Sequence, residues 1–245
     1  MKKVGMSIPV ANEEATIAEF LNSVLNEITN LPYSFTVYLV MDSFSRDNTL
    51  NIVKNMEEKD SRIKLIYYQE STGVVSCYLK GFECALQDGC DYIIEMDSGG
   101  SHPPEKIKDI VNALDVENYD AVFMSRFMKG GKMENLPFYR TIISRGGTIL
   151  ANFWLGTKYW DATSGFEAFK AEVLHSLDFT AFLSLGGIYQ TEMKYYLSNF
   201  KYKEIPFIYK GSTTAFKLKW IWIALKTLFK IKRNKNKALK DSSKI

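Results

Sequence analysis

The sequence contains little of what disulfide-rich, zinc-binding or membrane-spanning proteins need. It has three cysteines, Cys77, Cys84 and Cys90, and two histidines, His102 and His175, in 245 residues. An odd number of cysteines without C-x-x-C spacing argues against a disulfide framework or a zinc site. The simpler interpretation is that these cysteines are small side chains packed in or near a helix. No apolar run approaches the roughly 18 residues of a membrane span, and no signal peptide precedes the first predicted strand. We therefore expect a cytoplasmic protein.

Two common nucleotide-binding motifs are also missing. No G-x-G-x-x-G follows the first predicted strand, and no G-x-x-x-x-G-K-[ST] occurs anywhere, so the usual dinucleotide and P-loop interpretations fail. The net charge is only +3, and many of the lysines lie near the end of the sequence. Nucleic-acid binding therefore has weak support, and we expect no nucleic-acid partner.

What is present is an alternation of strand-like and helix-like segments. Hydrophobic residues make up 46% and charged residues 24% of the chain, which is typical of a globular α/β protein. Alternation predicts a mostly parallel sheet flanked by helices. The predicted strands cover residues 4–10, 34–42, 63–69, 90–97, 119–127 and 201–209. The predicted helices cover a stretch from Ile17 onward and residues 50–59, 73–89, 102–114, 139–156, 168–179 and 186–200, with a flexible loop at 128–138.

The end of the chain has a different character. Residues 216–245 mix tryptophan, isoleucine and phenylalanine with lysines at both flanks. This pattern suits a basic amphipathic helix that lies in a membrane interface, with its basic side chains on anionic head groups. The alternative is a helix packed on its own domain. We expect one domain at 1–215, a C-terminal helix or tail at 216–245, and a peripheral position on the inner face of the cytoplasmic membrane.

Polar residues follow several of the predicted strands, where ligands bind in an open parallel sheet. Asp42 ends the second strand and could accept hydrogen bonds from a nucleobase or ribose, or act as a turn or helix cap. Asp97 ends the fourth strand and could bind a divalent cation on a diphosphate, because Mg²⁺ typically takes only one or two carboxylates. Its alternative is a capping aspartate. Gly99 and Gly100, which follow it, allow a backbone to approach a ligand closely.

Basic residues are frequent after the fifth predicted strand. Arginine suits phosphate because its planar fork donates two parallel hydrogen bonds. Taken singly, these residues are better explained as solvated surface side chains, but their number around a Gly-rich loop favours a phosphate site. They are Arg126, Lys129, Lys132, Arg140 and Arg145.

Five motifs, in this order, resemble those of family-two glycosyltransferases. They are SIPVANEE at 7–14, VMDSFSRDNT at 40–49, YIIEMDSGGSHPPEKI at 92–107, SRF-x-x-GG from 125, and RTIISRGG…DATSGFEAF at 140–169. The branch that looks most similar contains dolichyl-phosphate mannosyltransferase and the bacterial polyprenyl-phosphate glycosyltransferases. The resemblance runs from about residue 4 to about residue 215.

The resemblance implies a GT-A fold and a transferase that builds cell-surface glycans. The donor would be a GDP- or UDP-linked sugar, the acceptor a polyprenyl phosphate or a glycan hydroxyl, and the transfer would invert the anomeric centre. Mg²⁺ or Mn²⁺ would bind the diphosphate through Asp97, with Ser101 as a weaker ligand. The nucleotide-binding positions would be Pro9, Ala11, Glu13 and Asp42. The acceptor-phosphate positions would be Arg126, Arg140 and Arg145. The catalytic candidates are Asp97, Arg126, Asp161 and Glu192, and of these Asp161 and Glu192 are the bases that a hydroxyl acceptor would need.

The sequence departs from the family at its metal motif. Two acids are usual in the pattern D-x-D, and this chain has Asp97-Ser98-Gly99. Losing one carboxylate weakens metal binding without necessarily abolishing it, because a diphosphate supplies its own oxygens. Three outcomes stay open: metal binding only with the donor, replacement of part of the metal's charge by basic residues, and loss of catalysis.

Two other functions compete with an active transferase. A catalytically silent sugar-nucleotide-binding subunit follows from the third outcome. A nucleotidyltransferase is the weakest, because no Gly-rich loop with a basic end follows the first strand. We favour the enzyme, since the arginines and the SGFEAF segment would be unnecessary in a relic.

Overall fold

The computed structural model describes residues 1–184, 186–211 and 219–239. The strands are β1 Lys3–Pro9, β2 Ser34–Asp42, β3 Ile63–Tyr68, β4 Tyr92–Glu95, β5 Ala121–Ser125, β6 Lys132–Glu134, β7 Glu167–Lys170, β8 Tyr202–Pro206 and β9 Ile208–Lys210. The helices are α1 Ile17–Thr29, α2 Thr49–Glu57, α3 Val74–Gln87, α4 Ile107–Asp115, α5 Phe138–Leu155, α6 Ala171–His175, α7 Tyr189–Tyr196 and α8 Lys219–Ala238, with short 3-10 helices η1 Pro104–Lys106 and η2 Phe179–Ala181. The expected boundary between 215 and 216 lies outside the described residues.

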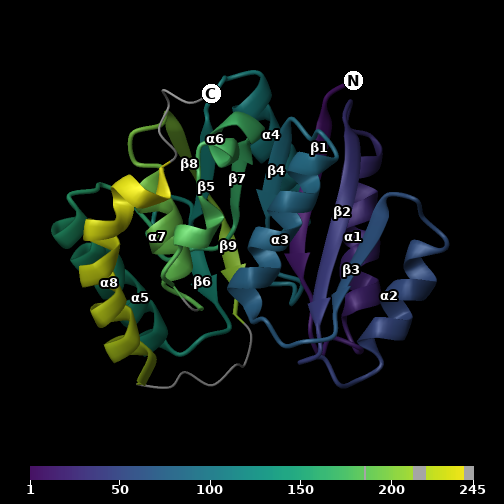
Figure 1. The fold of residues 1–245 in the computed structure, drawn as a ribbon, viewed down its shortest axis with the longest axis horizontal. Helices are drawn as coiled ribbons and strands as arrows, with labels where there is room; N and C mark the ends of the chain where they lie inside the picture. Colours follow the sequence, from purple (N-terminus) through teal and green to yellow (C-terminus); the bar gives the residue numbers. More distant parts are fainter. Residues whose placement is uncertain (185, 212–218, 240–245) are drawn as a thin grey trace.

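A seven-stranded sheet, in the order β3-β2-β1-β4-β7-β5-β8, forms the centre of the molecule (Figure 1). Neighbouring strands are parallel except around β7, which runs antiparallel to both β4 and β5. The mostly parallel α/β sheet with flanking helices is therefore confirmed. Because β7 is the only reversed strand of this sheet, β1, β2, β4 and β5 all end at the same edge.

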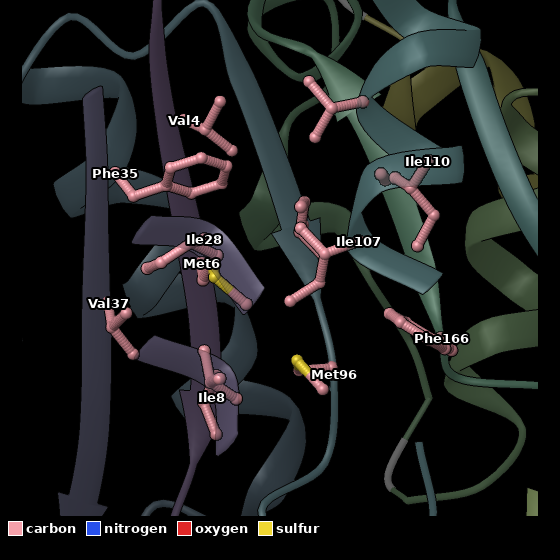
Figure 2. Close-up of a cluster of buried hydrophobic side chains, with 14 of the residues drawn as sticks. Val4, Met6, Ile8, Ile28, Phe35, Val37, Met96, Ile107, Ile110 and Phe166 are labelled. Carbon is pink, nitrogen blue, oxygen red and sulfur yellow. The ribbon is translucent and has the colours of Figure 1, made fainter. Parts of the chain in front are cut away.

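One face of the sheet is covered by α1 and α4. Along β1 the side chains of Val4, Met6 and Ile8 point to this face at the strand period of two, and all three are fully buried. They pack in a cluster that includes Ile107 of α4 and Phe166, which precedes β7 (Figure 2). The cluster thus ties the first strand to the middle of the sheet.

The opposite face carries α3, which packs very closely on β1. A Cβ at Gly81 of α3 would lie 2.0 Å from Ser7 Oγ of β1, so only glycine fits there without a shift. The Ser7 hydroxyl also donates a hydrogen bond to the carbonyl oxygen of Tyr78 at 3.0 Å. This contact fixes the position of Tyr78 of α3 relative to β1.

Three expectations from the sequence were wrong in detail. The loop expected at 128–138 contains the short strand β6, which pairs in parallel with β9. The segment expected to be a helix at 168–179 begins with β7 and holds only the short helix α6. The strand expected at 201–209 is divided into β8 and β9, which belong to different sheets. In each case strand pairing with a distant segment decides the conformation.

Helix α8 packs against the rest of the domain through part of its surface. Leu228 and Ile231 are buried, whereas Trp222 and Phe229 are exposed. The Phe229 ring lies 4.2 Å from that of Trp154 on α5, centroid to centroid. Among the described helices, none combines the length and the apolar character needed to cross a bilayer.

Replacing Gly81 with alanine should lower the free energy of unfolding by about 1–3 kcal/mol, because the added methyl overlaps the Ser7 side chain. Urea titration measures this. The matched control is Gly146→Ala within α5, where an added Cβ meets nothing within 4 Å. That variant should be neutral or up to about 1 kcal/mol more stable, since alanine favours a helix. Equal effects at the two positions would contradict the close α3–β1 contact.

Candidate active site

The edge of the sheet where β1, β2, β4 and β5 end gathers most of the residues that the sequence singled out. Asp42 is the last residue of β2, Asp97 follows β4, and Arg126 follows β5. Because β7 runs the other way, the segment 161–166 that precedes it also reaches this edge. The parallel and reversed strands together bring Asp161 beside Arg126, at a separation of 35 residues in the chain.

Asp97 is held from two sides and stays open on the rest of its surface. The Tyr78 hydroxyl donates a short hydrogen bond to Asp97 Oδ1. His102 Nδ1 accepts the Asp97 backbone N–H at 3.0 Å, and His102 Nε2 lies 3.5 Å from Asp97 Oδ2. The Asp97 side chain is 46% exposed. A carboxylate that is oriented by neighbours and still reaches solvent is suited to bind a ligand.

His102 is a buried part of this clamp. Its ring stacks on Phe166 with 4.9 Å between centroids. Burial lowers the pKa of His102, so the ring is neutral at pH 7. Since Nδ1 accepts a hydrogen bond, the proton is assigned to Nε2, the nitrogen that faces Asp97.

The residues around Asp97 fit a divalent cation only if other oxygens take part. In the described parts of the chain, no three His, Cys, Asp or Glu side chains come together as a metal cluster. Gly99 faces Glu13 without a side chain between them. If a Cβ were built on Gly99, the nearest heavy atom would be Glu13 Oε1, at 3.5 Å. Asp97 together with diphosphate oxygens satisfies the needs of Mg²⁺, which usually takes few protein ligands.

Asp161 forms a buried ion pair with Arg126. Arg126 Nε and Nη2 donate to the two Asp161 oxygens at 2.7 and 2.8 Å, and the Arg126 backbone N–H donates at 3.0 Å. Thr163 adds its backbone N–H and its hydroxyl, both at 3.1 Å. Burial alone would raise the pKa of Asp161, but the Arg126 guanidinium outweighs it and lowers this pKa below its usual value. With its oxygens occupied and its pKa low, this carboxylate is poorly placed to be a general base.

Glu192 is also fully engaged. It is buried on α7, and its carboxylate accepts the backbone N–H groups of Leu183 and Ser184 at 3.0 and 2.9 Å. The Tyr196 hydroxyl donates to it at 2.5 Å. Glu192 is thus neither a solvated helix-face residue nor a free base, because it organises the chain before α7.

Asp42 is expected on the nucleotide side, but its carboxylate oxygens accept hydrogen bonds from backbone N–H groups. It is 4% exposed and accepts N–H groups from Phe44, Thr72 and Gly73 at 3.0, 2.8 and 3.0 Å. Burial would raise the pKa of Asp42, but these backbone hydrogen bonds lower it below its usual value. Its side chain therefore fixes the loop that leads into α3, close to the end of β2.

The loops after β1 and β2 are joined by hydrogen bonds, which preorganises the expected nucleotide edge. Asn12 adopts a positive φ of 56° and accepts the Arg46 backbone N–H through Oδ1 at 2.9 Å. Glu13 donates its backbone N–H to Thr49 Oγ1 at 2.8 Å, and Glu14 Oε2 accepts the Asn48 N–H at 2.8 Å. Pro9 and Ala11 lie at the start of this loop pair, both partly exposed.

The basic residues are spread over the sequence after β5. Arg126 is 8% exposed, and its Nη1 makes no hydrogen bond with the residues that the structure describes. Arg140 and Arg145 lie on α5, where Arg145 is exposed and Arg140 is half-buried. Lys132 Nζ lies 3.1 Å from Glu134 Oε1 within β6. Arg126 neutralises Asp161 through their buried ion pair.

Sequence reasoning missed a buried charged cluster behind the site. Glu95 of β4 and Glu167 of β7 are register partners across the antiparallel pair, and both are fully buried. Lys194 of α7 is also fully buried and donates to Glu167 Oε1 at 2.5 Å and to the Ser164 carbonyl at 2.6 Å. The Tyr189 hydroxyl donates to Glu95 Oε2 at 3.2 Å. The only signal in the sequence was a glutamate inside an apolar run.

This cluster carries one positive and two potential negative charges. Burial raises the pKa of Glu167 to about 7, against the attraction of Lys194. Burial and the neighbouring Glu167 raise the pKa of Glu95 well above its usual value. Within the described chain, Glu95 Oε1 and Glu167 Oε2 have no hydrogen-bond partner. A protonated Glu95 beside the Lys194–Glu167 pair leaves the cluster neutral.

Replacing Lys194 with methionine should lower the free energy of unfolding by about 3–5 kcal/mol, because a buried carboxylate loses its counter-charge. The loss should be smaller at pH 5 than at pH 8. A carboxyl with a raised folded-state pKa contributes stability at low pH that disappears as pH rises through this value, which is about 7 for Glu167 before the change. Urea titrations at both pH values measure this.

The control for this prediction is Lys194→Met combined with Glu167→Gln, which removes both partners of the pair. It should recover much of the stability and most of the pH dependence. A loss that is equal at both pH values and persists in the double variant would contradict the proposed charge balance.

Comparison with known proteins identifies the family. Residues 7–178, more than half of the chain, match glycosyl transferase family 2. The chain is 32% identical over 179 residues to undecaprenyl-phosphate mannosyltransferase of Micrococcus luteus, covering 69% of this chain and 73% of that protein. It is 31% identical to polyprenol monophosphomannose synthase of Mycolicibacterium smegmatis, covering 69% of this chain but 64%, less than two thirds, of that protein.

A solved structure shows the same fold. Glucosyl-3-phosphoglycerate synthase from Mycobacterium tuberculosis, determined with Mn²⁺, UDP and phosphoglyceric acid, aligns with a TM-score of 0.65 and 15% identity over 98% of this chain and 80% of that one. The expected GT-A type of α/β fold and the expected enzyme class, a glycosyltransferase, are confirmed. The chain belongs to glycosyl transferase family 2.

Proposed function

We propose that this protein transfers a sugar from a nucleoside diphosphate sugar to the phosphate of a polyprenyl lipid. The observation that carries the proposal is Asp97, oriented by Tyr78 and His102 at the end of β4 and open on its remaining surface. Two relatives are named for polyprenyl-type lipid phosphates, and one protein of the same fold holds UDP with Mn²⁺.

The state of the carboxylates favours a phosphate acceptor over a glycan hydroxyl. A hydroxyl must lose its proton to a base, whereas a lipid phosphate is already anionic. Asp161 is saturated by Arg126 and Thr163, and Glu192 is turned to the backbone before α7. Neither of the two expected bases is available in this arrangement. The acceptor phosphate oxygen would displace the nucleoside diphosphate from the anomeric carbon with inversion.

The residues of the chain divide the work of this displacement. Loops 10–16 and 43–49 would hold the nucleoside, with Pro9, Ala11 and Glu13 on that side. Asp97 would orient the donor diphosphate, where a bound Mg²⁺ or Mn²⁺ supplies positive charge against the leaving group. Arg126 through Nη1, with Arg140 and Arg145, would attract the acceptor phosphate.

A membrane position follows from the same proposal. The exposed apolar side chains of α5 and α8, two helices that lie side by side (Figure 1), form a surface that we call the α5–α8 face. Its members include Phe138, Ile142, Ile149, Phe153, Trp222 and Phe229. Such a surface with nearby lysines suits a bilayer interface, and we place it on the inner face of the cytoplasmic membrane.

A direct assay tests the function. The purified protein is incubated with polyprenyl phosphate, Mn²⁺ or Mg²⁺, and a panel of GDP- and UDP-linked sugars, and the lipid-linked sugar is measured. We expect transfer from one donor class, with kcat/KM lowered roughly 100-fold or more by Asp97→Asn, which removes a charge at the diphosphate. The control Asp109→Asn changes an exposed carboxylate that pairs, among the described residues, with Lys106.

The panel also decides between the competing functions. Tight nucleotide binding without transfer or donor hydrolysis would instead identify a silent sugar-nucleotide-binding subunit. Transfer to a glycan hydroxyl but not to the lipid phosphate would contradict the argument from the occupied carboxylates.

Vesicle co-sedimentation tests the α5–α8 face. Phe153→Glu or Trp222→Glu should lower binding to vesicles that contain anionic lipid by roughly tenfold or more, since each change removes an aromatic ring worth about 1.5–3 kcal/mol when buried. Val116→Glu is the matched control, because Val116 is 72% exposed at the C-terminal end of α4, a helix that is not part of this face. Binding that is unchanged in all three variants would exclude this surface.

A further inference from the structure

The glycine in the metal motif stands opposite a carboxylate from another strand end. Among the described residues, a Cβ built on Gly99 has one heavy atom within 4 Å outside its own neighbours, Glu13 Oε1 at 3.5 Å. An aspartate at this position would carry its oxygens about 2.4 Å from Cβ, given carbon–carbon and carbon–oxygen bonds of roughly 1.5 and 1.25 Å. The Glu13 oxygen therefore lies within reach of the space that a second motif carboxylate would fill.

Glu13 is anchored in a way that leaves one oxygen to spare. Its backbone N–H is bound to Thr49 Oγ1 at 2.8 Å, and its carbonyl accepts the N–H of Ile17 at the start of α1 at 2.8 Å. Thr16 donates its hydroxyl to Glu13 Oε2 at 2.7 Å. Oε1, which faces Gly99, makes no hydrogen bond with the described residues. The backbone and one oxygen are fixed, and the other oxygen is presented to the motif.

A second polar residue, Ser101, lines a cavity next to Gly99. Ser101 is 4% exposed, and its hydroxyl has no hydrogen-bond partner in the described ranges. Ser101 lines a cavity of about 380 Å³ together with Gly99, Gly100 and Thr16, the residue that anchors Glu13. The Ser101 hydroxyl and the spare Glu13 oxygen are both hard oxygen donors in the neighbourhood of Gly99, the type of donor that Mg²⁺ and Mn²⁺ select.

We propose that Glu13 supplies the second carboxylate of the divalent-cation site, in place of the acid that is missing at Gly99. The site is then divided between two strand ends, with Asp97 after β4 and Glu13 after β1, and the Ser101 hydroxyl beside them. The inference rests on the proposed function, because the cation is the one that accompanies the donor diphosphate. It assigns this chain's Glu13 to the metal instead of to the nucleoside.

The alternative role of Glu13 is a hydrogen bond to the nucleoside itself. The two roles differ in their dependence on metal. A nucleoside contact strengthens nucleotide binding equally with and without the cation, whereas a metal ligand acts only when the cation is present. Comparing the two conditions in one variant therefore separates them.

The experiment measures the affinity for UDP and GDP by calorimetry in Mn²⁺ and in EDTA, for the full-length protein and for Glu13→Gln. In the wild type, Mn²⁺ should tighten binding. Glu13→Gln keeps an oxygen for Thr16, so it should fold, and it should reduce the gain from Mn²⁺ roughly tenfold or more. In EDTA its affinity should stay within about twofold of the wild type. The loss of the free Mn²⁺ signal in electron paramagnetic resonance gives a direct count of bound metal.

The matched control is Glu19→Gln, the same change on an exposed carboxylate in the first turn of α1. It should leave the gain from Mn²⁺ within about twofold of the wild type. An equal loss in both variants would show that general negative charge, and not a ligand, is responsible, and would overturn the proposal.

Gly99→Asp provides the reciprocal test in the Glu13→Gln background. Among the described residues, the side chain at position 13 is the only group near this Cβ, and Gly99 is not in the left-handed region, so an aspartate fits. Restoring the acid at 99 should restore the gain from Mn²⁺. Failure of this rescue, in a variant whose urea midpoint matches the wild type, would overturn the proposal.

The remaining outcomes separate this inference from the proposed function. If Glu13→Gln weakens binding equally in Mn²⁺ and EDTA, Glu13 contacts the nucleoside and the inference is wrong while the transferase remains. If wild-type binding is the same in both conditions, the site does not use a cation and the inference again fails alone. If the wild type binds no nucleoside diphosphate at all, the proposed function fails with it.

Discussion

The reversed strand β7, placed between β4 and β5, is the constraint on which the site depends. Because it runs against its neighbours, the segment that precedes it arrives at the edge where β4 and β5 end. Asp161 is thereby brought to Arg126, which neutralises it. The same insertion sets Glu167 opposite Glu95 inside the protein, and two buried carboxylates side by side need the compensating charge of Lys194. The Asp161–Arg126 pair at the site and the buried Glu95–Glu167–Lys194 cluster both result from the antiparallel insertion of β7.

The acidic residues near this edge fall into two groups that differ in their spare hydrogen-bonding capacity. Asp42, Asp161 and Glu192 accept several hydrogen bonds each and serve to fix loops. Asp97 and Glu13 retain surface or an unpaired oxygen. A carboxylate that already accepts three or more hydrogen bonds can bind a ligand only by giving some of them up, which costs about as much as it gains. The second group therefore has oxygens available to a ligand, and the first has few to offer.

Features set by neighbouring residues could be predicted from the sequence, whereas features set by residues far apart in the chain could not. Strand β2 has the bounds that its apolar run predicts, and Asp97 lies at the strand end where the pattern placed it, because both depend on local periodicity. β7 was missed because its four residues pair only with strands more than forty positions away. The buried glutamate in YIIEMD was visible as an anomaly, but its partner Lys194 could not be inferred from a sequence in which many lysines are alike. The position of Tyr78 beside Asp97 depends on how closely α3 packs on β1. Gly81 makes this close packing possible, but a single glycine within a helical pattern does not predict it.

Helix α5 connects the chemistry of the site with the nature of the acceptor that we propose. Its first half carries Arg140 and Arg145, and both halves expose apolar side chains, from Phe138 at one end to Phe153 at the other. A free phosphate or a soluble glycan would use only the basic positions and leave the aromatic and aliphatic surface in water, where large contiguous apolar patches are rare without a partner. A polyprenyl phosphate has an anionic head and an apolar tail, so it could use both features of one helix. The composition of α5 therefore supports a lipid acceptor independently of the occupied carboxylates.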